Sequence, residues 1–345
     1  MKIGIVTQPL YANYGGILQN YALQQVLKKM GHEPVTLDYM PSLSFGRYLL
    51  YAGKTFVCAF SPAKRHPLKP YSRFLKRPSD IKSFIDNNIA LTRTIPDYTG
   101  KVLKKNGIEA IIVGSDQVWR YSYNSHYLED MYLDFAKDYD CPKIAYAASF
   151  GVDKWDCPDV KTAEAKELIK QFRAVSVRED SAVGLCRDYL GADATVVLDP
   201  TLLLTASDYQ KFCSAPQAEE GPYLAAYVLD INEEKNAFIE KVAEERGLKV
   251  KSMTVSGSGC SIEEWLTTIN NASYVITDSY HGTIFSIIFG KQFHTIVNKE
   301  RGADRFVTMF EKLGIDGGAA DYDAVYSKLD LLRLESLGFI AKNLY

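Results

Sequence analysis

His281 is the residue of this sequence that is best placed for proton transfer. It is one of only five histidines, and it stands where a predicted strand, 274–277, gives way to a predicted helix, 283–289. An imidazole titrates near neutral pH and can therefore accept and donate a proton, while the N–H groups of a helix start can hold an anion. We expect a general acid or base at an exposed helix start, and a capping or core histidine is the alternative.

A second anion-binding geometry is predicted near the N-terminus, where a strand ends and Tyr14, Gly15 and Gly16 lead into a helix. Glycine permits the close approach of a ligand to backbone N–H groups. The spacing matches neither a dinucleotide fingerprint nor a Walker loop, so a helix start that only needs flexible residues is an equal alternative. Asn20, one turn further on, either faces the same site or packs inside.

Small and polar residues also follow two other predicted strands. Ser115 and Asp116 come after one of them and Ser149 after the next. Open α/β sheets bind their ligands at the carboxyl ends of the strands, so these positions are candidates for ligand contacts. Trp119 could stack on a sugar ring, although a single tryptophan more often fills a core.

Arginines follow two more predicted strands. Arg178 offers a planar fork for a carboxylate or phosphate, and the alternative is an ion pair with Glu179 or Asp180. Arg301 and Arg305 come after the last strand of the chain. A pair of arginines there would suit a phosphate compound with several negative charges.

Repeated strand–loop–helix units must position these residues, which is typical of an α/β fold with parallel sheets. Strands are predicted at 2–7, 35–38, 110–113, 144–148, 174–177 and 196–198, and then at 223–229, 248–254, 274–277 and 293–297. Helix starts are marked by Asn232 and by a Ser261–Glu264 capping box. A length of 345 residues suits two domains, and we expect the boundary near residues 206–221.

Composition excludes several classes of protein. A formal net charge of -2 argues against a polycationic nucleic-acid binder, and no apolar run reaches the roughly 20 residues of a membrane span. Six cysteines without a C-x-x-C pair, and a start without a signal peptide, predict a cytoplasmic protein with reduced thiols. The sequence shows no ligand cluster for a fixed metal.

Residues 42–78 interrupt the α/β rhythm. This insertion contains eight basic residues, no acidic residue and many aromatic residues. Such a composition suits peripheral contact with the inner face of a membrane. The alternative is a helical excursion with a solvated basic face.

Seven short motifs, in this order along the chain, resemble the polysaccharide pyruvyl transferase family. They lie at 14–20, 114–119, 149–151, 176–179, 198–201, 279–282 and 290–293. The resemblance implies two Rossmann-like domains that face each other across a cleft, as in GT-B glycosyltransferases. The domains would be 1–210 on the acceptor side, with the basic insertion, and 211–325 on the donor side. A C-terminal helix, 326–345, would pack back on the first domain.

The resemblance also implies phosphoenolpyruvate as the donor and two hydroxyls of a sugar or lipid-linked oligosaccharide as the acceptor, without a cofactor. By this resemblance, His281 would be the catalytic acid or base and Arg178 would be a ligand of the donor anion. The other residues implied at the donor are Ser279, Tyr280, Gly282, Asn298, Arg301 and Arg305. Those implied at the acceptor are Tyr14, Gly15, Gly16, Asn20, Ser115, Asp116, Trp119 and Ser149.

One position departs from the family pattern. Some members carry an arginine two residues before the histidine, where this chain has Ser279. Either Arg301 or Arg305 must supply the positive charge of that arginine, or the donor is a compound other than phosphoenolpyruvate. Two other functions remain open: a GT-B-type glycosyltransferase that uses a nucleotide sugar, and a sugar-binding protein without catalysis.

Overall fold

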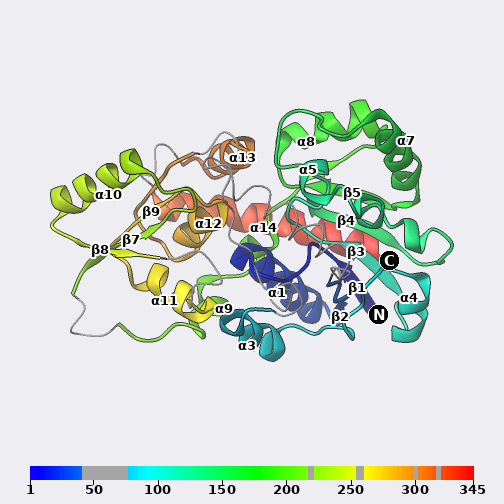
Figure 1. The fold of residues 1–345 in the computed structure, drawn as a ribbon, viewed down its shortest axis with the longest axis horizontal. Coiled ribbons are helices and arrows are strands. Elements are labelled where there is room, and N and C mark those ends of the chain that lie inside the picture. Colours follow the sequence, from blue (N-terminus) through cyan, green and yellow to red (C-terminus); the bar gives the residue numbers. More distant parts are fainter. Residues whose placement is uncertain (41–76, 217–220, 254–259, 298–301, 316–319) are drawn as a thin grey trace, which may run out of the picture.

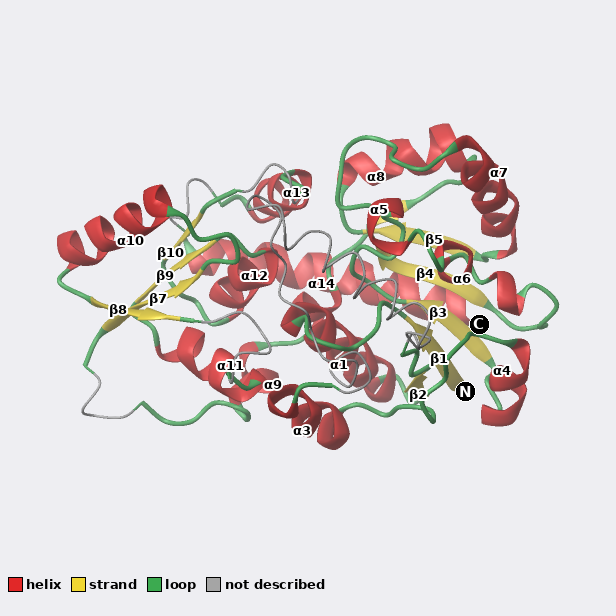
Figure 2. Ribbon diagram, in the orientation of Figure 1, coloured by secondary structure: helices red, strands yellow, loops and turns green. Residues whose placement is uncertain are grey.

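Two parallel sheets form the framework of the protein. The computed structural model describes residues 1–40, 77–216, 221–253, 260–297, 302–315 and 320–345. The strand order is β2-β1-β3-β4-β5-β6 in the first sheet and β10-β9-β7-β8 in the second, and all of these pairings are parallel. Figure 2 shows the two sheets apart from each other, with helices packed around both. The predicted fold class, α/β with two Rossmann-like domains across a cleft, is confirmed.

The bounds of the elements are as follows. The strands are β1 (Lys2–Val6), β2 (Glu33–Thr36), β3 (Ala110–Val113), β4 (Lys143–Ala148), β5 (Ala174–Val177), β6 (Thr195–Val196), β7 (Tyr223–Tyr227), β8 (Lys249–Ser252), β9 (Tyr274–Thr277) and β10 (Phe293–Thr295). The first-domain helices are α1 (Tyr14–Lys29), α3 (Ser79–Asn88), α4 (Gly100–Asn106), α5 (Tyr121–Asn124), α6 (Leu128–Met131), α7 (Asp159–Leu168), α8 (Asp180–Leu185) and α9 (Ala206–Gln210). They are followed by α10 (Glu233–Arg246), α11 (Ile262–Asn271), α12 (Tyr280–Ile288), α13 (Asp304–Leu313) and α14 (Tyr322–Leu344).

Local signals in the sequence place most of these elements well. Strands β3, β5 and β9 have the predicted bounds, and helix α10 begins directly after Asn232, as predicted. The predicted caps are confirmed, since Asn232 accepts a hydrogen bond from the N–H of Lys235 and the Ser261–Glu264 capping box is formed. Helix α12 differs, because it begins at Tyr280 and not at Thr283. This earlier start places His281 inside the first helical turn.

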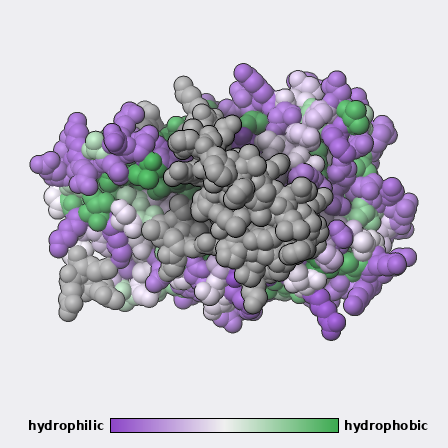
Figure 3. Space-filling view, in the orientation of Figure 1, coloured by the Kyte–Doolittle hydropathy of each residue, from purple (hydrophilic) through white to green (hydrophobic). Residues whose placement is uncertain are grey.

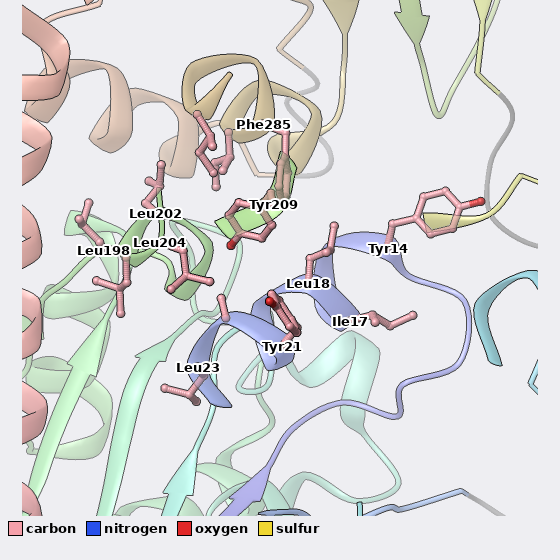
Figure 4. Close-up of a cluster of buried hydrophobic side chains, with 14 of the residues drawn as sticks. Tyr14, Ile17, Leu18, Tyr21, Leu23, Leu198, Leu202, Leu204, Tyr209 and Phe285 are labelled. Carbon is pink, nitrogen blue, oxygen red and sulfur yellow. The ribbon is translucent and has the colours of Figure 1, made fainter. Parts of the chain in front are cut away.

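A shared apolar core joins the two domains. One cluster of buried side chains includes residues of α1, of the short 3-10 helix Pro200–Leu203, and of α9, α11 and α12. Figure 4 shows Tyr209 between the α1 residues and Phe285 of α12. The rings of Tyr209 and Phe285 are 4.9 Å apart at an angle of 78°. The domains are therefore held together by continuous hydrophobic packing.

Helix α14 adds a second connection between the domains. Figure 1 shows it as a long red helix that extends from the second domain to the first. At its start, the hydroxyl of Tyr326 donates to the carbonyl of Ile287, 3.1 Å away. Further along, Ser336 accepts a hydrogen bond from the N–H of Leu198, at 3.0 Å. The predicted domain limits stay a prediction, and the described α14 begins at Tyr322.

On the face in Figure 3, hydrophilic side chains predominate at both ends of the molecule. No helix within the described residues has both the length and the apolar character that a membrane crossing requires. The basic insertion lies almost wholly within 41–76, outside the described residues, so its predicted membrane contact stays a prediction.

Candidate functional site

A cavity of about 240 Å³ lies between the two domains. Its walls follow the carboxyl ends of β1 and β3 in the first domain and of β7 and β9 in the second, where parallel sheets place ligands. Helices α1 and α12 both begin at this cavity. The lining residues are Ala12, Asn13, Tyr14, Gly15, Asp116, Gln117 and Tyr123 from the first domain, and Tyr227, Leu229, Trp265, Asp278, Ser279, Tyr280, His281 and Arg305 from the second.

His281 lies at the contact between the domains. Only 7% of it is exposed, so the predicted exposed helix start is wrong. The reason is Gly15 at the start of α1, whose backbone lies directly against the imidazole: a Cβ on Gly15 would overlap Nδ1. The imidazole nevertheless reaches the cavity. Its other nitrogen, Nε2, faces the carboxylate of Asp199 at 3.7 Å.

Asp199 is a site residue to which the sequence analysis gave no role. Its Oδ1 accepts hydrogen bonds from the N–H and the hydroxyl of Thr201, at 3.0 and 2.6 Å, so the carboxylate is rigidly held. Burial alone would raise the pKa of Asp199, but His281 and Arg178 outweigh burial and hold this pKa well below its usual value. The charged carboxylate is an ion-pair partner for Nε2 when the imidazole is protonated. Nε2 itself is fully buried, so Nδ1 is the nitrogen that is left for a substrate.

Arg178 lies behind the cavity wall and does not line it. Its side chain is fully buried, at 2.8 Å from Asp199, 3.5 Å from Asp116 and 3.8 Å from Glu179. Burial would lower the pKa of Arg178, but the surrounding negative charges raise it above its usual value. The predicted direct contact with a donor anion is therefore wrong for this structure, because the guanidinium is surrounded by carboxylates of the chain itself. Nη1 of Arg178 donates a hydrogen bond to Asp199, and the contact with Glu179 fits the alternative prediction of an ion pair within the chain.

Arg305 is the described arginine that lines the cavity. Its guanidinium carbon lies 4.9 Å from the ring centre of Tyr280, as does that of Arg178. Burial, and then the positive charge of Arg178, lower the pKa of Arg305 to about 10. It remains protonated at neutral pH, so two buried cations share one aromatic ring. Arg301 and Asn298 lie outside the described residues.

Asp116 brings a carboxylate to the first-domain wall. Its Oδ2 accepts a hydrogen bond from Nδ2 of Asn13 at 2.9 Å. Its φ of 74° lies in the left-handed region, which is uncommon for a residue other than glycine. Gly16 leaves room for this carboxylate, because a Cβ there would lie 3.2 Å from Oδ2. Asp116 and Gly15 both line the cavity, and their predicted contacts with an acceptor stay a prediction.

Trp119 does not reach the cavity. It is 2% exposed, stacks on Tyr132 with ring centres 5.0 Å apart, and donates from Nε1 to the carbonyl of Met131. The predicted stacking of Trp119 on a sugar is therefore wrong, because the side chain packs in the core of the first domain.

Several other predicted contacts are also internal. Asn20 accepts from the hydroxyl of Thr36 at 2.9 Å, and the hydroxyl of Ser115 accepts from Gln19 at 2.9 Å. The hydroxyl of Ser149 donates to Glu179 at 2.9 Å. All three predicted acceptor residues are buried and do not line the cavity, so they support the wall and do not form it.

The start of α12 contributes two of the three residues predicted beside His281. Ser279 and Tyr280 line the cavity, and the hydroxyl of Ser279 caps the helix by accepting from the N–H of Gly282 at 3.3 Å. Gly282 itself does not line the cavity. It packs on β9, where a Cβ would overlap the side chain of Thr277.

Distant similarities to solved structures cover nearly the whole chain. A UDP-GlcNAc 2-epimerase from Methanocaldococcus jannaschii is 13% identical, with a TM-score of 0.49, over 96% of this chain and 93% of that one. A putative UDP-N-acetylglucosamine 2-epimerase from Listeria monocytogenes is 10% identical, with a TM-score of 0.45, over 97% and 96%. An alpha-glucosyltransferase in complex with UDP and a 13-mer DNA is also 10% identical, with a TM-score of 0.45, over 99% and 95%.

No curated protein matches this sequence. A family model does match it, over most of its length. The profile of one family, described as polysaccharide pyruvyl transferase, matches residues 13–300. This range includes Gly15, Asp116, Asp199 and His281, which meet at the cavity or just behind its wall. The chain therefore belongs to the polysaccharide pyruvyl transferase family.

Proposed function

We propose that this protein transfers the pyruvyl group of phosphoenolpyruvate to two neighbouring hydroxyls of a sugar and so forms a cyclic ketal. The observation that carries the proposal is the meeting of two groups at one inter-domain cavity. His281, supported by the buried Asp199, suits proton transfer. Arg305, buried in the same wall, suits an anionic substrate.

The second-domain wall has the charge that a phosphoenolpyruvate site needs. Arg305 supplies a guanidinium that can bind a carboxylate or phosphate through two hydrogen bonds. Tyr280 is the first residue of α12, so the positive end of that helix also faces the cavity. These features support donor binding on this side. The carboxylate of Asp116, on the opposite side, suits the hydroxyls of an acceptor.

The proposed chemistry uses His281 as the proton donor. Nδ1 gives a proton to the methylene carbon of the enol phosphate, and the first sugar hydroxyl bonds to the carbon that bears the phosphate. Phosphate leaves with the electron pair of its C–O bond, and the second hydroxyl bonds to the same carbon. Each hydroxyl loses one proton. One of these protons restores His281 and the other leaves with inorganic phosphate, so the reaction balances.

The test is to incubate the protein with phosphoenolpyruvate and a panel of methyl glycosides. We expect phosphate release only when an acceptor is present, with an equal amount of ketal, which is detected by the methyl signal in the proton NMR spectrum. Consumption of a UDP-sugar in place of phosphoenolpyruvate would make the protein a glycosyltransferase. Binding of glycosides without turnover of either donor would make it a sugar-binding protein. Either result contradicts the proposal.

Gly15→Ala should lower kcat without unfolding the protein. The added Cβ would overlap Nδ1 of His281, so the imidazole must move away from its present position. A misplacement of about 1 Å at a reacting group can cost on the order of 100-fold in rate. The measurement is kcat in the phosphate-release assay, together with the melting temperature.

Gly338→Ala is the matched control, because a Cβ there meets no atom within 4 Å. The control should keep both kcat and the melting temperature. If Gly15→Ala retained normal kcat, the close contact between Gly15 and His281 would not matter for the reaction.

A further inference from the structure

Tyr123 stands out among the aromatic residues of the cavity. It is 50% exposed, whereas Tyr14, Tyr227, Trp265 and Tyr280, which line the same cavity, are buried. Tyr123 lies on α5 of the first domain, on the side opposite Arg305 and His281. Half of an aromatic side chain is thus left in contact with solvent at the edge of the candidate site.

The turn that carries Tyr123 is held rigidly by its neighbours. Asn124 is fully buried, and its Nδ2 donates to the carbonyls of Gln117 and Val118 at 2.7 and 2.9 Å. Asp156 accepts from the backbone N–H groups of Tyr121 and Ser122, at 3.3 and 3.1 Å. These contacts fix the backbone without using the ring of Tyr123. The backbone that carries the exposed ring is therefore well anchored.

Arg120 supports the exposed ring. Its guanidinium carbon lies 4.2 Å from the ring centre of Tyr123. The guanidinium is itself oriented, because Nη1 donates to Oε1 of Gln117 at 2.8 Å and Nε donates to the hydroxyl of Ser122 at 3.1 Å. Such a contact between a cation and an aromatic face restricts the rotamers of both side chains. Tyr123 is thus positioned before any ligand arrives.

We propose that Tyr123, supported by Arg120, is a stacking platform for the ring of the saccharide acceptor. A pyranose has one face of C–H groups, which packs on an aromatic ring, and its hydroxyls stay available to polar groups such as Asp116. This platform performs the role that the sequence suggested for Trp119, four residues earlier. The inference rests on the proposed function, because it assigns the acceptor to the first-domain wall.

Tyr123→Ala is the variant that tests the platform, with Tyr123→Phe as the conservative partner. Loss of a stacked ring should raise the KM for a methyl glycoside acceptor about 10-fold and leave the KM for phosphoenolpyruvate unchanged. Tyr123→Phe should stay close to the wild type. Tyr189→Ala is the control, since Tyr189 is also an exposed tyrosine but stacks on Trp155, outside the cavity lining.

A binding experiment separates the platform from the chemistry. Saturation-transfer NMR with the same methyl glycosides, in the absence of phosphoenolpyruvate, should show binding to the wild type and to Tyr123→Phe but not to Tyr123→Ala. This result would support the platform even if phosphoenolpyruvate were never turned over, in which case the proposed function alone fails. Equal glycoside binding by wild type and Tyr123→Ala, or no glycoside binding by the wild type, would overturn the platform.

Discussion

Replacement of His281 by alanine is expected to lower kcat by about 100- to 10,000-fold, which is the usual contribution of a general acid or base. The imidazole lines the cavity, and its Nε2 lies 3.7 Å from the buried carboxylate of Asp199. Alanine fits the first turn of α12, and the cap formed by Ser279 uses backbone atoms of Gly282 that the change leaves in place. The measurements are kcat and the melting temperature.

His126→Ala is the control for this experiment, because His126 is exposed and does not line the cavity. It should keep normal turnover. Near-normal kcat in His281→Ala would remove His281 from the mechanism. An unfolded His281→Ala variant would also contradict the assignment, since it would give the imidazole a structural role at the contact with Gly15.

Arg178→Met is expected to lower the free energy of unfolding by about 3–5 kcal/mol at pH 7, because it leaves buried carboxylates without their counter-charge. Asp199 loses a partner at 2.8 Å, and Asp116 and Glu179 lose one at 3.5 and 3.8 Å. The measurement is denaturant unfolding of both proteins. Arg187→Met, which removes an exposed arginine paired with Asp188, is the control and should change stability little.

The effect of Arg178→Met on the free energy of unfolding should depend on pH. The sign of this dependence follows from the pKa of Asp199. The pKa of Asp199 is held below its usual value in the folded protein, partly by Arg178. The stability that this shift contributes is present above the unfolded pKa, about 4, and is lost as the pH falls through the folded pKa. The difference between wild type and Arg178→Met should therefore be largest near neutral pH and shrink below about pH 4. A difference that grew on acidification would mean that Arg178 does not stabilise a charged carboxylate.

Local signals in the sequence predicted the fold more reliably than the site. Strand β3 is a continuous apolar run, β9 is apolar up to Thr277, and caps such as Asn232 depend on residues three positions apart. These features need no knowledge of distant neighbours. Two parallel sheets, and a histidine at the start of the helix after β9, could therefore be predicted.

The errors at the site come from contacts between distant parts of the chain. Trp119 and Tyr123 lie four residues apart in one polar, aromatic segment, and only the packing of the first-domain core decides that Trp119 is inside and Tyr123 outside. Arg178 was expected to bind a ligand, yet Asp116 and Asp199 reach it from other strand ends. Asp199 had no sequence signal of its own beyond its place in a family motif.

The hydrophobic cluster that Tyr209 and Phe285 share across the two domains also governs how the molecule responds to heat. Loss of packing in either domain would expose apolar surface of the other, so we expect the two domains to unfold together. The cavity lies at this same boundary, and its groups come from both sides of it. We therefore expect loss of activity on heating to coincide with global unfolding of the protein.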